Sequence, residues 1–272
     1  MKETKAPDGY KLDETVHSFT LDSEKPQSIA LYIPNEKEKG YIKFEKTGEM
    51  LTGIQDDTSY PNLKELIWSQ QRLENAEIGI YATEPVSLDG RTYQKGDLIQ
   101  RLESGKISQP LPVGTYQYKE LSAPDDYILD KEFYDIEVTK DHVEEAAALA
   151  EMANTHASVA LNLHKKFKDG NTAEKLKKVV FGVYAASTII SNEIQIPKET
   201  LLGILRIDEN GQSINMDLKL PQGSYYVMEI ETEDGYVLDG RRYPFITDYQ
   251  NRNQTVEISS AEDPIINETV YG

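Results

Sequence analysis

Three glutamates occupy equivalent places in three copies of one short sequence pattern, and they are the residues best placed to do chemistry in this chain. The stretch LPVGTYQYKELSAPDDY at 111–127 recurs, diverged, as LPQGSYYVMEIETEDGY at 220–236, and a shorter copy, KETKAPDGY, lies at 2–10. In each copy a glutamate stands seven residues before the closing tyrosine, and these residues are Glu3, Glu120 and Glu229. A single such glutamate would ordinarily be a solvated surface residue. Its repetition at a fixed place argues against that interpretation.

Strand periodicity predicts where two of these carboxylates point. Successive side chains of a strand face opposite sides, so Tyr116, Tyr118 and Glu120 share one face. Tyr225, Val227 and Glu229 repeat the arrangement. If the apolar face is the core face, both glutamates point inward, where an ionised carboxylate is costly unless it has a partner.

Composition limits the function classes that need to be considered. A chain of 272 residues suggests about two domains, and 28% charged with 38% hydrophobic residues is typical of a globular protein. The formal net charge of −18 argues against nucleic acid and anionic membranes as partners, because both require a basic surface. No apolar run approaches the roughly 20 residues of a spanning helix, and no signal-like apolar segment follows Met1. We therefore expect no membrane insertion in this chain.

Residue usage also restricts the available chemistry. The chain has no cysteine, which excludes disulfides, thiolate catalysis, thioesters and cysteine metal sites. The histidines show no metal-ligand spacing and are interpreted as solvated or loop residues: His17, His142, His156 and His164. We expect neither a metal nor a cofactor.

Two long repeats make up most of the chain and predict an all-β fold. Each begins with an apolar row that ends in a lysine, namely Ile42, Phe44 and Lys46 in the first, and Leu161, Leu163 and Lys165 in the second. A strand of the form A-x-(I/F)-G-(I/V)-Y-A follows, and then the strand that carries the glutamate. Short strands separated by Gly, Pro and Asp turns indicate β-sandwich domains. Only DHVEEAAALAEMAN, at 141–154, has the composition of a short helix.

Asparagines complete the pattern at the ends of the repeats. Asn267 shares a strand face with Ile265, and Asn35 ends an apolar row of Ile29, Leu31 and Ile33 in a segment where HSFTLD and SIALYIP predict strands. Asn154 precedes Lys165 by 11 residues (165 − 154), as Asn35 precedes Lys46 (46 − 35). Each full repeat therefore offers an inward lysine, glutamate and asparagine. A buried amine and carboxamide beside a carboxylic acid are one condensation away from an amide, with ammonia as the leaving group.

These motifs together resemble the Cna B-type, or SpaA-type prealbumin-like, domains of Gram-positive surface proteins and pilins. The resemblance lies in E-x-x-A-P-D-x-Y after L-P-x-G-x-Y, in G-Y-I-K-F-E-K, in the A-x-(I/F)-x-(I/V)-Y-A strand and in the closing I-x-N-E. It implies two tandem immunoglobulin-like or prealbumin-like β-sandwich domains with Greek-key connections. We expect a remnant of a preceding domain at 1–37, a domain at 38–156 with an insertion at 51–72, and a second domain at 157–272.

In that family the lysine and asparagine join as an intramolecular isopeptide bond that the glutamate promotes. Carried over by position, the resemblance implies a triad of Lys46, Glu120 and Asn154 and a triad of Lys165, Glu229 and Asn267. Glu3 and Asn35 would belong to the remnant, whose lysine strand is missing. The second repeat departs from the family pattern, with ETEDGY in place of the A-P pair. A V-Y-P-K pilin motif and an L-P-x-T-G sorting signal are not found.

The resemblance implies a structural stalk of an extracellular adhesin or pilus, attached to the cell wall, whose partners are the neighbouring domains of the same protein. The bonds would form in a single-turnover reaction, so the chain would not be an enzyme. The alternative is an adhesive module that binds a host protein or glycan through the insertion around Trp68, because long loops on rigid scaffolds often carry binding. A hydrolase is disfavoured because Glu120 and Glu229 lie in separate repeats and do not form a two-carboxylate site.

Overall fold

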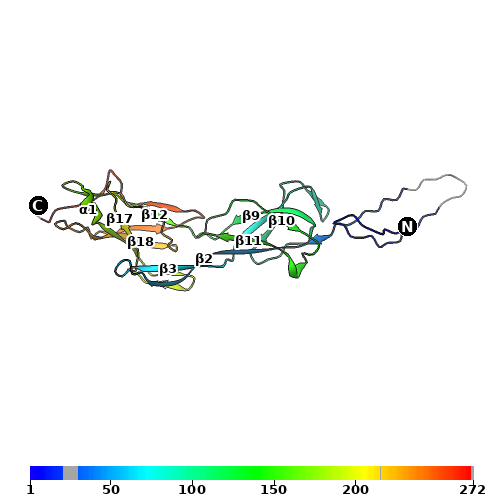
Figure 1. The fold of residues 1–272 in the computed structure, drawn as a ribbon, viewed down its shortest axis with the longest axis horizontal. Helices are drawn as coiled ribbons and strands as arrows, with labels where there is room; N and C mark the ends of the chain where they lie inside the picture. The colour runs from blue at the N-terminus through cyan, green and yellow to red at the C-terminus, as the bar shows by residue number, and fades with distance from the viewer. Residues whose placement is uncertain (21–29, 215, 271–272) are drawn as a thin grey trace. The chain divides into compact units, whose positions relative to one another are not determined.

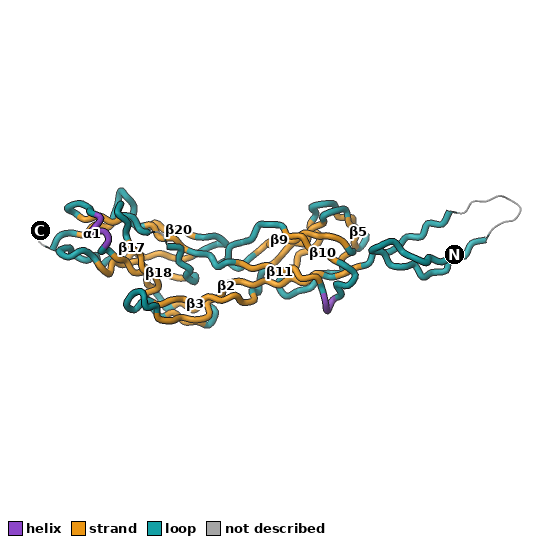
Figure 2. Tube along the Cα trace, in the orientation of Figure 1, coloured by secondary structure: helices purple, strands orange, loops and turns teal. Residues whose placement is uncertain are grey.

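The computed structural model describes residues 1–20, 30–214 and 216–270, and the fold consists almost entirely of β-strands. In Figure 2 strands and loops account for nearly all of the described trace. The all-β prediction is confirmed. The chain divides into two compact units, which we describe separately: unit 1 comprises 1–46, 74–122 and 130–152, and unit 2 comprises 47–73, 123–129 and 153–272.

Unit 1 is built on an antiparallel sheet in the order β10-β9-β4-β7. Its apolar face meets Ile42 and Phe44 of β2 and Ala150 of β11, and together they form one buried core. The strands and the single 3-10 turn are β1 (Lys39–Gly40), β2 (Ile42–Asp56), β4 (Glu77–Ala82), β5 (Val86–Leu88), β6 (Arg91–Tyr93), β7 (Leu98–Glu103), β8 (Leu111–Pro112), β9 (Gly114–Ser122), β10 (Tyr134–Val138), η1 (Glu144–Ala146) and β11 (Ala148–Asn154). Figure 1 labels β9, β10 and β11 in this unit.

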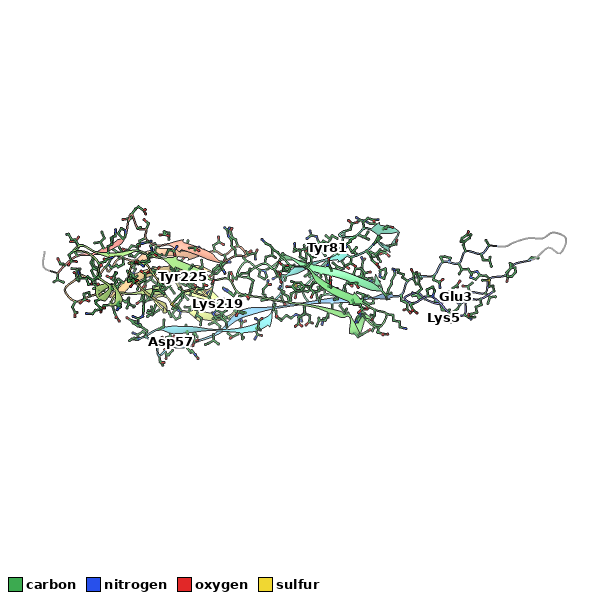
Figure 3. The ribbon with its side chains drawn as sticks, turned by 45° about the horizontal axis from the view of Figure 1, so that its top comes forward. Glu3, Lys5, Asp57, Tyr81, Lys219 and Tyr225 are labelled. Atoms are coloured by element: carbon green, nitrogen blue, oxygen red, sulfur yellow. The ribbon has the colours of Figure 1, made fainter. Side chains whose placement is uncertain are left out.

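Unit 2 repeats the plan with a sheet in the order β17-β14-β18-β19. Two parallel pairs, β12-β20 and β13-β21, contribute to the opposite layer. The core between them contains Phe181, Tyr225 and Tyr249, and Figure 3 shows Tyr225 within this unit. Its elements are β3 (Lys64–Arg72), β12 (Val159–Asn162), β13 (Lys165–Phe167), α1 (Ala173–Lys177), β14 (Val180–Ala185), β15 (Ile189–Ser191), β16 (Ile194–Ile196), β17 (Leu201–Arg206), β18 (Gly223–Glu231), β19 (Tyr243–Thr247), β20 (Gln254–Glu257) and β21 (Ile265–Asn267).

Strand β2 is unusually long, and its second half forms an antiparallel hairpin with β3. This hairpin corresponds to the predicted insertion and packs on the core of unit 2. Leu51 is buried in that core, and Leu66 and Trp68 lie against it. The Lys219 ammonium donates to both Glu49 carboxylate oxygens at 2.7 Å.

The repeated motifs have local structural causes. In L-P-x-G-x-Y the buried tyrosine hydroxyl donates to the proline carbonyl four residues earlier, at 2.6 Å for Tyr116 and 2.7 Å for Tyr225. In the A-x-(I/F)-G-(I/V)-Y-A strand, the tyrosine ring lies over the glycine. A Cβ at Gly79 would come within 2.7 Å of the Tyr81 ring, so no larger residue fits there.

The helix expected within 141–154 is wrong for most of its length. Only Glu144–Ala146 form a 3-10 turn, and Ala148–Asn154 are strand β11 with strictly alternating burial. Pairing with β2 overrides the helical propensity of the alanines, because tertiary context commonly outweighs propensity. A helix that the sequence analysis did not predict, α1, begins after Thr172, whose side chain caps it by accepting from the Lys175 N–H.

The strands expected in the N-terminal segment are also not formed in its described part. The segment contains an isolated bridge between Tyr10 and Lys37, but residues 11–20 and 30–36 form no strand. Strands need a paired neighbour and a buried face, and the described part of this segment forms no sheet that would supply them. Ile29, the first residue of the predicted apolar row, lies outside the described residues.

Candidate functional site

In unit 2 the first and last strands of the repeat bring a lysine and an asparagine together. Strands β13 and β21 pair in parallel, with Lys165 opposite Ile265 and Phe167 opposite Asn267. Glu229 comes from β18, where it lies opposite Phe181 of β14. Lys165, Glu229 and Asn267 are each at most 1% exposed. Three segments far apart in sequence therefore direct three polar side chains into one dry site.

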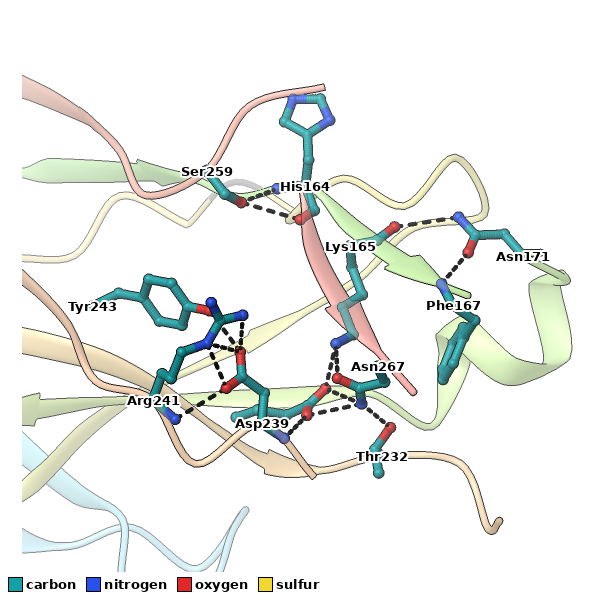
Figure 4. Close-up of polar contacts among 11 residues, drawn as sticks. His164, Lys165, Phe167, Asn171, Thr232, Asp239, Arg241, Tyr243, Ser259 and Asn267 are labelled. Carbon is teal, nitrogen blue, oxygen red and sulfur yellow. Dashed lines mark hydrogen bonds and ion pairs between the residues drawn. The ribbon is translucent and has the colours of Figure 1, made fainter. Parts of the chain in front are cut away.

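These three side chains contact one another directly. The Lys165 ammonium lies 3.0 Å from Oε1 of Glu229 and donates to Oδ1 of Asn267. The Asn267 amide nitrogen donates to both Glu229 oxygens, at 3.0 and 2.9 Å. Figure 4 shows the contacts as a closed network around the carboxamide. The structure thus assembles the predicted set of Lys165, Glu229 and Asn267.

The surroundings of Lys165 favour a neutral amine. Burial lowers the pKa of Lys165, and the attraction of the Glu229 carboxylate opposes only part of that shift. The Phe167 and Phe181 rings lie 5.9 and 5.8 Å from the nitrogen, so aromatic carbon takes the place of water there. A lysine becomes a nucleophile only as the free amine, and desolvation is what supplies it.

A backbone contact that is present in both repeats fixes the glutamate. The Asp239 N–H donates to Oε2 of Glu229 at 2.7 Å. The carboxylate of Asp239 in turn accepts from Arg241 at 2.9 Å and from the Tyr243 hydroxyl at 2.5 Å. Burial raises the pKa of Asp239, but these hydrogen bonds outweigh it and hold the pKa below its usual value. Glu229 is therefore oriented by a residue that is itself held firmly.

In unit 1 the lysine and the glutamate also meet. The Lys46 ammonium lies 2.8 Å from Oε1 of Glu120, and both side chains are fully buried. Burial lowers the pKa of Lys46, while Glu120 opposes the shift. The Asp130 N–H donates to Glu120 at 2.7 Å, and the Tyr134 hydroxyl donates to Asp130 at 2.7 Å. The frame matches that around Glu229.

The third predicted residue of the first set, Asn154, is the last residue of β11 and is buried. Strand β11 adjoins β2, the strand that carries Lys46. The sequence analysis located this asparagine from spacing alone, and it lies on the inward-facing row of its strand with Ala150 and Met152.

The N-terminal segment reproduces two of the three groups. The Asn35 amide donates to both Glu3 oxygens at 2.9 and 2.8 Å, and the Asp13 N–H donates to Glu3 at 2.7 Å. His17 contacts Asp13 at 2.7 Å, where the repeats have a tyrosine. Figure 3 shows Glu3 in this segment. The structure thus brings Glu3 and Asn35 together.

The supporting aspartates and tyrosines were missed by the sequence analysis, although the sequence contains a signal for them. Each copy continues past its closing tyrosine as Y-x-L-D, which places Asp13, Asp130 and Asp239 at one position. Four residues later come His17, Tyr134 and Tyr243. Extending the repeat by seven residues would have identified them.

Of the two expectations for the histidines, solvated or in a loop, His156 meets only the second, because it lies between β11 and β12 and is buried. Its ring is 3% exposed and lies among Trp68, Tyr127 and Tyr249, with ring centroids 4.3, 5.6 and 5.6 Å away. Burial lowers the pKa of His156, so the imidazole is held neutral. A histidine can be buried here because one ring nitrogen is satisfied by the Ala157 carbonyl at 2.7 Å.

Comparison with known proteins identifies the family. A family model described as SpaA, a prealbumin-like fold domain, matches residues 67–151 and again residues 160–262. The chain belongs to this family. The match covers well over half of the sequence and confirms two tandem prealbumin-like domains. The SpaA fold is that of a structural domain of pilins and not of an enzyme class.

Several solved structures are similar to this chain. The Bacillus anthracis TIE protein is similar at 20% identity with a TM-score of 0.53, over 98% of this chain and 41% of that one. This SpaA-family chain therefore spans about two fifths of that protein. A C-terminal fragment of the pilus adhesin SpaC from Lactobacillus rhamnosus GG (14% identity, TM-score 0.40) and the shaft pilin SpaA from the same organism (10%, 0.30) are matched over 86% and 85% of this chain and 98% of theirs. No curated protein sequence matches it.

Within the described residues, no helix is long and apolar enough to cross a membrane. Nor does that part of the chain gather three or more histidine, aspartate or glutamate side chains as a metal site would require.

Proposed function

We propose that this chain is a stalk segment of a Gram-positive surface adhesin or pilin, locked by two intramolecular isopeptide bonds. One bond joins Lys165 to Asn267 and is promoted by Glu229. The other joins Lys46 to Asn154 and is promoted by Glu120. The observation that carries the proposal is the fully buried contact of the Lys165 amine, the Glu229 carboxyl and the Asn267 carboxamide. The proposal retains the division at 1–37, 38–156 and 157–272.

Each bond forms by condensation with balanced loss of ammonia. The neutral lysine nitrogen attacks the asparagine Cγ, the Cγ–Nδ2 bond breaks, and one lysine proton travels through the glutamate to the departing nitrogen. The glutamate acts as general acid and base, and each site reacts once. Proximity supplies the rate, because groups held in contact behave as if at effective concentrations of about 10⁵ M or more.

The crosslinks explain how a chain without cysteine could withstand force and proteases. Lys165 and Asn267 lie 102 residues apart, on adjoining first and last strands of one repeat. A bond there ties the two ends of the repeat together, so tension on the chain bypasses the strands between them. This is a property of a spacer between neighbouring domains of the same protein. The family match and the folds of pilins support an extracellular, wall-attached or pilus location.

Intact mass tests the proposal directly. The mass of the folded chain should fall short of its sequence mass by two ammonia molecules, and digestion should yield branched peptides that join Lys165 to Asn267 and Lys46 to Asn154. A full sequence mass would refute the crosslinks. A deficit of one ammonia with only the Lys165 branch would show that Asn154 is assigned wrongly.

A second candidate function, binding of an extended peptide, is favoured by a groove of about 670 Å³ in unit 2. The hairpin lines it with Tyr60, Leu66 and Trp68, and β17 lines it with Ile204 and Arg206. Strands β3 and β17 are edges of their sheets, joined at one end by the Leu63–Leu201 bridge. Edge strands offer backbone donors and acceptors to an added strand, so the occupant would be an extended peptide from a host protein.

A displayed library of random nonapeptides tests this second function, with selection on the wild-type chain. Ile214, which is 52% exposed at the groove, provides a variant that should leave the fold intact. Peptides that bind wild type and lose at least tenfold affinity for Ile214→Glu would support the groove as a site. Selected peptides that bind both proteins equally, or no selected peptides, would refute it.

A further inference from the structure

The carboxamide of Asn267 has a hydrogen-bond acceptor that the triad does not include. Its amide nitrogen donates to the Thr232 hydroxyl at 2.7 Å, in addition to the Glu229 carboxylate. A primary amide has two hydrogens, so one is directed to Glu229 and the other to Thr232. The carbonyl oxygen then faces Lys165, as the contact between them shows. Figure 4 shows Thr232 on the side of the amide away from Lys165.

Thr232 stands where the other copies of the motif have alanine. It lies three residues after Glu229, as Ala123 lies three after Glu120 and Ala6 three after Glu3. An alanine methyl cannot accept a hydrogen bond. In the N-terminal copy the corresponding amide hydrogen of Asn35 goes to the Lys11 carbonyl at 3.0 Å instead. The hydroxyl at this place is therefore a feature of unit 2 and not of the shared fold.

We propose that Thr232 is a positioning residue that holds the leaving nitrogen of Asn267 toward Glu229 during crosslink formation. The inference rests on the proposed isopeptide reaction and adds a group to it. Condensation requires the Asn267 nitrogen, and not its oxygen, to face the proton donor. The Thr232 hydroxyl accepts the second amide hydrogen, so the nitrogen is anchored on two sides and the plane of the carboxamide is fixed with its carbonyl beside Lys165.

The reaction separates this role from a merely structural one. The Cγ–Nδ2 bond breaks, the Lys165 nitrogen bonds to Cγ, and Nδ2 leaves as ammonia with the proton passed on by Glu229. Thr232 thus loses its partner when the crosslink forms. A positioning role predicts an effect on the rate of bond formation and no effect on the stability of the crosslinked product. A structural role predicts the reverse.

The experiment follows bond formation during cell-free synthesis of the whole chain. Samples are quenched in denaturant at intervals and digested, and the branched peptide joining Lys165 to Asn267 is quantified by mass spectrometry. The peptide joining Lys46 to Asn154 serves as an internal clock in the same molecules. Thr232→Val keeps the shape and removes the acceptor, Thr232→Ser restores it, and Thr232→Ala guards against misfolding caused by valine.

We expect Thr232→Val and Thr232→Ala to slow the Lys165 bond roughly three- to tenfold relative to the clock, the factor that one hydrogen bond represents. Thr232→Ser should react at the wild-type rate. The slowing should be the same at every pH, because threonine does not titrate. Fully crosslinked wild type and Thr232→Val should melt at the same temperature.

Equal rates for wild type and Thr232→Val would overturn the inference and leave the crosslink proposal standing. So would a lower melting temperature of the crosslinked Thr232→Val chain, with no change in rate. Absence of the Lys165 branched peptide in wild type is a different result, because it would refute the proposed function itself.

Discussion

The sites of unit 1 and unit 2 share a backbone frame and differ in the side chains around it. In both, the glutamate accepts from an aspartate N–H at 2.7 Å, through Asp130 in one and Asp239 in the other. Both aspartates also accept from the backbone N–H two residues later, at Glu132 and Arg241. The turn is thus fixed by backbone donors, and backbone donors do not depend on which side chain follows.

At two positions near the glutamate, the side chains of the two sites differ in charge and in hydrogen-bonding capacity. Arg241 pairs with Asp239, whereas Glu132 occupies the equivalent place in unit 1. Thr232 accepts from the reacting amide, whereas unit 1 has Ala123. The comparison teaches that the contact of lysine with glutamate and the turn that holds the glutamate are common to both sites, whereas the neighbouring side chains are not.

Removing either glutamate should have the largest effect, because it would break the equivalence of the two sites. Glu120→Ala and Glu229→Ala should each abolish one crosslink and leave the other complete, since each carboxyl serves only its own repeat. Intact mass should show a deficit of one ammonia molecule for each variant. Glu231→Ala, on the same strand but exposed, is the control and should retain both bonds. A variant lacking its glutamate that still loses both ammonia molecules would disprove the catalytic assignment.

The burial of the candidate site residues could be predicted from the sequence because it follows a short-range rule. Strand alternation placed Glu120 and Glu229 on the apolar face. An equal spacing of 11 residues indicated Asn154, although the alanine-rich composition around it favoured a helix and the structure has a strand there. The role of Thr232 could not be predicted in this way. Its contact with Asn267 joins residues 35 apart, and no periodicity links them.

Loss of a crosslink should lower stability by nearly the same amount in both repeats, although the two bonds are expected to form at different rates. The joined residues are 102 apart in the second repeat and 108 apart (154 − 46) in the first. Closing loops of about 100 residues stabilises by up to about 4 to 5 kcal/mol in the chain-entropy model, and the dependence on length is logarithmic. Chemical denaturation of Glu120→Gln and Glu229→Gln measures it. A difference of several kcal/mol between them would show that loop closure is not the source.

The packing of the hairpin also lay beyond sequence reasoning. The apolar residues of LKELIW predicted a packed surface or a binding surface, and both interpretations fit the same pattern. Trp68 lies against His156, which is 88 residues away (156 − 68), and only the fold brings them together. Because the two rings are so far apart in sequence, no local pattern indicates that His156 is buried.

A buried histidine distinguishes the core of unit 2, and acid should affect that unit first. The pKa of His156 is lowered by burial below its ordinary value of 6.5, against the opposing effects of the Ala157 carbonyl, Asp126 and Glu49. The unfolded chain therefore binds a proton that the folded chain resists. Stability is full above pH 6.5 and falls as the pH drops below it, by at most about 1.4 kcal/mol per pH unit.

Denaturation between pH 7.5 and 5.5 tests this expectation in an uncrosslinked background, Glu120→Gln with Glu229→Gln. Substitution His156→Gln should flatten the pH dependence, whereas His164→Gln, at a half-buried histidine of the same unit, should leave it in place. Equal pH slopes for the parent and His156→Gln would contradict the assignment.

The N-terminal segment should show the smallest effect, because its described residues, 1–20 and 30–37, place the acceptor half of a site together with no buried amine beside it. Glu3 and Asn35 keep the geometry found at Glu229 and Asn267, within about 0.1 Å for the amide contacts. Lys11, whose backbone carbonyl contacts Asn35, has a side chain that is 57% exposed and pairs with Glu36 at 3.2 Å. A hydrated ammonium is a poor nucleophile, since its lone pair is protonated.

Asn35 should therefore remain an amide in the isolated chain, and Asn35→Ala should leave the deficit of two ammonia molecules unchanged. Peptide mapping would settle the point, with Asn267→Ala as the comparison that must lose one bond. A branched peptide joining Asn35 to Lys46 or Lys165 would instead show that the lysines pair across the assumed boundaries near residues 38 and 157. In that case the contacts seen at each asparagine would not explain which lysine it joins. The expected result, by contrast, would leave burial of the amine as the deciding difference between Asn35 and Asn267.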